Sequence, residues 1–80
     1  MGQQAWTADI IISRASVAKN PDKDGMYLVT FVDDKGERRM DLDLEYSNQK
    51  DAFTMASYST GNGVVSTPRD GVGVWIWERK

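Results

Sequence analysis

The sequence predicts a mainly β (α+β) domain, a small five-stranded antiparallel barrel or a strongly curved sheet with one short helix. Three observations predict this class. Apolar residues recur with a period of two over most of the chain, turn residues interrupt that period at short intervals, and one central segment changes to a helical period. The 80 residues are enough for one domain with one modest core, which we expect to span residues 1–80.

The first predicted strand runs from about Trp6 to Val17, and Ile11 lies on the face opposite Ile10 and Ile12. The segment KNPDKDG follows and indicates a turn, because its proline fixes φ and its glycine permits a positive φ. The next segment, MYLVTFV, is β-branched and aromatic throughout, which is typical of a strand. Both strands carry apolar residues on both faces.

The third predicted strand returns after DDKGE, where Gly36 suits the left-handed position of a short hairpin loop. Its apolar and polar residues alternate. The apolar set is Met40, Leu42, Leu44 and Tyr46, and the polar set is Arg39, Asp41, Asp43 and Glu45. This alternation predicts one buried face and one solvated face with a firmly set register.

The period changes at Ser47, and a helix is predicted from near Asn48 to near Tyr58. Ser47 or Asn48 is a suitable N-cap, and Gly61 lies just beyond the predicted end. A narrow apolar stripe predicts the buried side of this helix: Ala52, Phe53, Met55 and Ala56.

A second hairpin is predicted from GVVSTPRDGVGVWIW, with its turn at Pro68 and Gly71. Its last strand places Val72, Val74 and Ile76 on one side and Trp75 and Trp77 on the other. The resulting order of three strands, a helix and two strands is that of an OB-like barrel. An SH3-like barrel, or an open antiparallel sheet carrying one helix, gives much the same order.

Composition argues against several classes of function. Cysteine and histidine are both absent, so the sequence offers no disulfide, no thiolate or imidazole ligand and no neutral-pH general base. We expect no enzymatic activity, no cofactor and no metal. The net charge of −2 disfavours non-specific nucleic-acid binding. The apolar runs, such as Ile10–Ile12, are far too short for a membrane span, and we expect a cytoplasmic protein.

The two-sided strands carry more apolar surface than one small barrel and one narrow helix can cover. The sequence therefore predicts an outward aromatic patch beside an acidic strand face. The aromatic residues are Trp75, Trp77, Tyr27 and Phe31, and the acidic residues are Asp41, Asp43 and Glu45. Aromatic anchors are typical of protein interfaces, and carboxylates attract a basic partner surface. We expect a non-catalytic protein-binding module, whether adaptor, inhibitor or subunit of a homo-oligomer.

Three alternatives remain open at this point. The segment around Trp6 or the loop around Met26 can fold over the second face and enlarge the core instead. An OB-like barrel can bind single-stranded nucleic acid on its aromatic residues if basic side chains gather at one edge, namely Arg38, Arg39, Arg69, Arg79 and Lys80. An enzyme that uses carboxylates alone, or with a metal held by Asp41 and Asp43 together with Glu45, is the least favoured.

Overall fold

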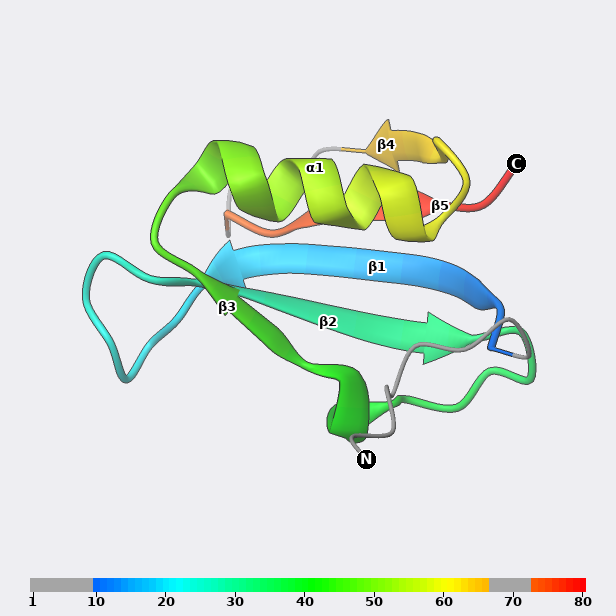
Figure 1. The fold of residues 1–80 in the computed structure, drawn as a ribbon, viewed down its shortest axis with the longest axis horizontal. Coiled ribbons are helices and arrows are strands. Elements are labelled where there is room, and N and C mark those ends of the chain that lie inside the picture. The colour runs from blue at the N-terminus through cyan, green and yellow to red at the C-terminus, as the bar shows by residue number, and fades with distance from the viewer. Residues whose placement is uncertain (1–9, 67–72) are drawn as a thin grey trace, which may run out of the picture.

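The computed structural model describes residues 10–66 and 73–80. Within them, five strands form one antiparallel sheet in the order β3-β2-β1-β5-β4, and one α-helix crosses a single face of it (Figure 1). The elements are β1 (Ile12–Lys19), β2 (Tyr27–Asp33), the 3-10 helix η1 (Met40–Leu42), β3 (Leu44–Tyr46), α1 (Gln49–Ser59), β4 (Val64–Ser66) and β5 (Trp75–Glu78).

The predicted mainly β class, antiparallel pairing and order of strands and helix are confirmed. The closed barrel is wrong, because β3 and β4 lie at opposite margins of the sheet and do not pair with each other, and the structure has the alternative of an antiparallel sheet that carries one helix. The two margin strands, β3 and β4, have only three residues each. Their edges are therefore too short to pair with each other and close a barrel around the core.

The strand register decides which side chains α1 covers. Ala15 in β1 lies between Phe31 in β2 and Trp77 in β5, and Val17 lies between Val29 and Trp75. Side chains on one face of neighbouring strands point the same way, so these residues form one apolar layer beneath α1. The core consists of Ile12, Ala15, Val17, Val29, Phe31, Leu42, Ala52, Ala56 and Trp77.

The helix is the element that the sequence predicted best. Asn48 is its N-cap and accepts a hydrogen bond from the backbone N–H of Asp51 at 2.8 Å. Ala52 and Ala56 are fully buried, and their small side chains let the helix approach the sheet closely. At the other end, the Arg79 guanidinium donates to the carbonyl of Ser59 at 3.0 Å and so pairs one of the last helical carbonyls.

The third predicted strand is wrong in its first half. Residues 40–42 form η1, and only the last three residues of the predicted segment are a strand. Met40, expected to be buried, is 73% exposed. The Arg39 guanidinium binds the carboxylate of Asp41 through two hydrogen bonds, and the N–H of Leu42 donates to the Arg39 carbonyl at 3.1 Å. These local bonds favour a turn, which still buries Leu42 in the core.

The first strand begins later than predicted, at Ile12, and the predicted residues 6–9 lie outside the described part of the chain. A β-bulge between Ile12 and Arg14 shifts the register against β2. The bulge lets Ile12 and Ala15, three positions apart, share the buried face. Ser13 supports it by donating its hydroxyl to the carbonyl of Asp33 at 2.8 Å. The predicted turn at Pro68 and Gly71 also lies outside the described residues.

Asp33 closes β2 and organises the loop that follows. Its carboxylate accepts hydrogen bonds from the backbone N–H groups of Lys35 at 3.0 Å and Glu37 at 2.9 Å, while the residue is only 5% exposed. The bond from Glu37 is the main cause that lowers the pKa of Asp33 below its usual 3.8; burial opposes the shift, and the bond from Lys35 and the nearby Arg39 reinforce it.

We expect Asp33 to make the stability of the protein sensitive to acid. Its lowered pKa means that the folded protein holds the ionised form, so this stabilisation is present above pH 4 and is lost as the pH falls through the folded-state pKa. Asp33→Asn removes the charge. The free energy of unfolding of this variant should therefore fall furthest below that of the wild type near pH 6, and the difference should shrink in acid. Urea unfolding across this range measures it, with Asp34→Asn as the control. A deficit independent of pH contradicts the assignment.

Candidate protein-binding site

The predicted outward aromatic patch is wrong as a description of the surface. Phe31 is fully buried and Trp77 is 5% exposed, while Tyr27 and Trp75 are partly buried against the core. The register places all four on the face that α1 covers. Phe53 of α1 packs on both indoles, with ring centroids 5.1 Å from Trp75 and 4.9 Å from Trp77.

The predicted acidic strand face is also wrong. Asp41 lies in η1 and Asp43 just after it, so only Glu45 is on a strand. Each carboxylate binds a basic neighbour, and the pairs are Arg39–Asp41 at 2.8 Å, Arg38–Asp43 at 2.8 Å and Lys23–Glu45 at 3.1 Å.

The first of these pairs shifts both of its pKa values. The hydrogen bond between the side chains of Arg39 and Asp41 is the main cause that lowers the pKa of Asp41 and raises that of Arg39. Each of the three carboxylates is paired with a basic side chain, so the three pairs together carry no net charge that would attract a basic partner.

Within residues 10–66 and 73–80, no three acidic side chains are grouped so as to hold a metal ion. None of the helices in those ranges has the length and apolar character needed to cross a bilayer.

A shallow hollow of about 440 Å³, widely open to solvent, lies between α1 and Trp77 of β5. Two pairs of neighbouring residues, one helical turn apart on α1, line it together with one loop residue and one indole of β5. The lining is Phe53, Thr54, Ser57, Tyr58, Asn62 and Trp77. The floor is therefore aromatic, and the side walls carry hydroxyl and amide groups without charge.

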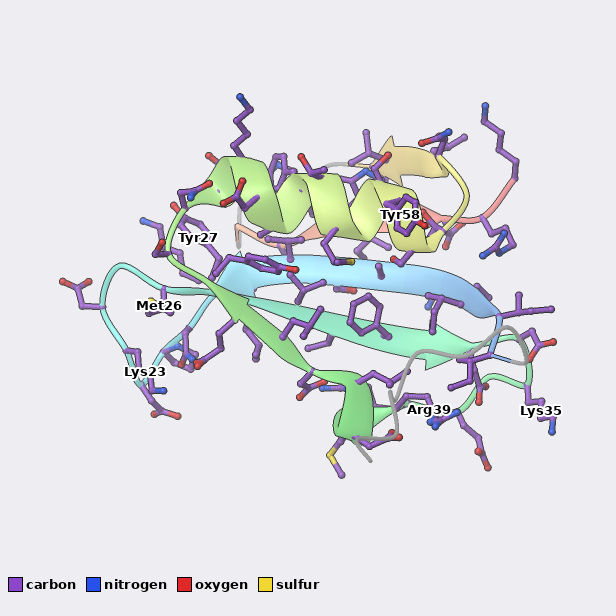
Figure 2. All side chains as sticks on the ribbon, viewed as in Figure 1. Lys23, Met26, Tyr27, Lys35, Arg39 and Tyr58 are labelled. Carbon is purple, nitrogen blue, oxygen red and sulfur yellow. The ribbon has the colours of Figure 1, made fainter. Side chains whose placement is uncertain are left out.

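Two of the predicted site residues differ in their relation to this hollow. Trp77 forms part of its floor, because its buried ring faces α1. Tyr27 lies elsewhere: Figure 2 shows it at the end of α1 opposite to Tyr58. Tyr58 is 77% exposed on the C-terminal half of α1 and forms the outer wall. The tyrosine available to a partner is thus one that the strand pattern did not single out.

The margin strand β4 lies next to the hollow. Its residue Val65 pairs with Trp77 across the β4–β5 ladder, and α1 packs on β1, β2 and β3 instead of on β4. Val65 is 48% exposed on the face where α1 lies, and Val64, which pairs with Glu78 and therefore points to the opposite face, is 62% exposed. A sheet margin that carries exposed valine and no charged residue is unusual, because natural proteins generally block such edges.

The sheet face away from α1 accounts for the remaining apolar side chains of the two-sided strands. Leu28, Val32 and Ile76 lie on it and are each partly exposed. Across the ladders of β1, Leu28 pairs with Ala18, Val32 pairs with Arg14, and Ile76 pairs with Ser16. The ion pair between Arg14 and Glu78, at 2.9 Å, crosses this face.

The arginines considered for nucleic acid are engaged within the protein. Arg38 and Arg39 bind carboxylates, and Arg79 donates to the carbonyls of Ile12 and Ser59 at 2.8 and 3.0 Å. Arg69 lies outside the described residues. The described part of the chain therefore brings no cluster of unpaired arginines to the hollow.

The residues that sequence reasoning missed are Phe53, as part of the floor, together with Tyr58 and Val65. The sequence does contain a signal for Tyr58. It lies on the predicted helix but outside the apolar stripe, one helical turn after Thr54, which indicates an exposed aromatic side chain. Comparison with protein-family models, with curated proteins and with solved structures returned no match for this chain.

Proposed function

We propose that this chain is a non-catalytic protein-binding module and that its binding site is the hollow between α1 and β5 beside the open margin at β4. The observation that carries this proposal is the aromatic floor formed by Phe53 and Trp77 next to β4, which has a neighbouring strand on one side only within residues 10–66 and 73–80. Of the aromatic residues predicted to bind a partner, this site contains only Trp77. The proposed binding surface is the hollow, in place of the outward aromatic patch predicted from the sequence.

The chemistry of the lining favours an apolar side chain of a partner as the occupant. An aromatic floor contributes buried apolar area, which is the main favourable term in association. The hydroxyls of Ser57 and Tyr58 and the amide of Asn62 stand at the walls, where they can pair with polar backbone groups of a partner. This combination of apolar floor and polar rim is typical of protein interfaces.

A library of random linear peptides displayed on phage tests the proposal. We expect the wild-type chain to select peptides that share a large apolar residue and bind with micromolar affinity in calorimetry. Ser57→Phe fills the hollow, so it should weaken binding of the selected peptides by at least about tenfold.

The matched control is Lys50→Phe, which adds the same ring to an exposed position of α1 outside the hollow and should leave affinity unchanged. Failure to select peptides, or equal binding by the Ser57→Phe variant, overturns the proposal. The same titration with a thymidine oligonucleotide at low salt examines the nucleic-acid alternative. Oligonucleotide binding that weakens with salt and is lost in Ser57→Phe would replace the protein partner with single-stranded nucleic acid.

A further inference from the structure

The hydrogen-bonding directions of the last ladder can be assigned residue by residue. The N–H of Arg79 donates to the carbonyl of Ser13 at 2.9 Å, in register with the β1–β5 pairing. Bonding directions alternate along an antiparallel strand, so the backbone groups of Trp75 and Trp77 also face β1. The backbone groups of Ile76 and Glu78 then face the other way, toward β4.

This alternation determines what the margin strand offers to a partner. Val64 pairs with Glu78 and Ser66 pairs with Ile76, so both use their backbone groups in the β4–β5 ladder. The N–H and C=O of Val65 consequently point away from β5, and β4 has no neighbouring strand on that side in the described part of the chain.

The two margins of the sheet differ in how they are protected. At β3, Glu45 binds Lys23 at 3.1 Å and also accepts from the side chain of Asn20, so charged and amide groups occupy that margin. The sequence of β4 is Val-Val-Ser and carries no charge. Charged residues at a margin strand discourage the addition of another strand, and the three residues of β4 supply no such charge.

We infer that the partner binds by strand addition, in which an extended, uncharged segment pairs with β4 and places a large apolar side chain in the hollow. This inference rests on the proposed function and adds the mode of binding and the class of partner. The segment is uncharged because neither β4 nor the lining of the hollow carries a charge. A charged side chain entering there would lose its hydration without a compensating partner.

The size of the hollow favours a different protein over a second copy of this chain. A symmetric β4–β4 pair would place Val65 of the second copy beside Val65 of the first, on the side that faces α1. Gly63, two positions before Val65 on the same face, has no side chain. Among residues 63–66 of the second copy, valine alone would therefore enter the hollow of about 440 Å³. A segment with leucine or an aromatic residue at the corresponding position fits better.

Peptides selected on the wild-type chain also test this mode of binding. N-methylation of one peptide backbone nitrogen at a time should weaken binding at alternate positions only, since every second N–H of an added strand faces β4. Val65→Pro removes the N–H at the open margin while the ladder bonds of Val64 and Ser66 remain, and we expect at least about a tenfold loss of affinity. Val65→Thr keeps the N–H and the branched shape, so its affinity should stay within about threefold.

The outcomes separate this inference from the proposed function. If Ser57→Phe abolishes binding but N-methylation shows no alternation, the hollow binds a side chain without strand addition and the inference fails alone. If Ser57→Phe has no effect, both fail. Light scattering that shows a wild-type dimer, dissociated by Val65→Pro, would make a second copy the occupant and overturn the inference. The N-methyl series remains decisive even if Val65→Pro does not fold.

Discussion

Trp77→Ala is expected to remove most of the free energy of unfolding of the protein. The indole is 5% exposed, packs edge-on against Phe53 at 4.9 Å and lies opposite Ala15 in the central ladder. Truncating a buried aromatic residue costs about 3–5 kcal/mol, because it removes buried apolar area and leaves a cavity. Small domains are stabilised by only about 5–15 kcal/mol in total, and a domain of this size lies near the lower end.

Urea unfolding followed by far-UV circular dichroism measures this loss without depending on the removed fluorophore. Tyr58→Ala, on the exposed side of α1, is the matched control and should change the unfolding free energy by less than about 0.5 kcal/mol. A Trp77→Ala variant as stable as the wild type would show that the indole is a surface anchor, as the sequence alone suggested.

Gly63→Ala is expected to displace β4 and to lose both stability and partner binding. A Cβ at this position would lie 2.3 Å from the carbonyl oxygen of Glu78 and 2.7 Å from the hydroxyl oxygen of Thr60. The first neighbour is backbone of the paired strand, so the strands must separate. Such overpacking costs about 1–3 kcal/mol, and we expect a loss of affinity for the selected peptides as large as that of Val65→Pro.

Gly36→Ala provides the comparison for this variant. Gly36 has φ +84° with open space around it, so alanine there strains the backbone by about 1–2 kcal/mol without disturbing β4. Stability should fall in both variants, but peptide affinity should fall only in Gly63→Ala. If the two variants bound the peptides with equal affinity, the position of β4 would not be needed for peptide binding.

The sequence predicted the helix more accurately than the strands because the signals of the helix are local. Asn48, Asp51 and the pair of alanines define its start and its buried side within a few residues of one another. The segment 39–46 shows the limit of the strand period. Alternation of apolar and polar residues there fits a strand, but the contact between Arg39 and Asp41 favours η1 instead.

The candidate site could be predicted only in part. The pattern of β5 correctly placed Trp75 and Trp77 on one face, yet it assigned that face to solvent instead of to α1. A period of two separates two faces of a strand but carries no information about which of them another element will cover. The hollow itself combines residues from α1, a loop and β5, so no single stretch of sequence contains it.

The sequence by itself determined the order and type of the elements, the absence of cysteine and histidine chemistry, and the presence of apolar residues on both faces of several strands. Only the tertiary structure decided that the sheet is open, that α1 covers the indoles, that basic residues pair with the predicted acidic face and that β4 is left at the margin. The reason is physical: local patterns set backbone conformation, whereas exposure and pairing depend on neighbours brought together from distant parts of the chain.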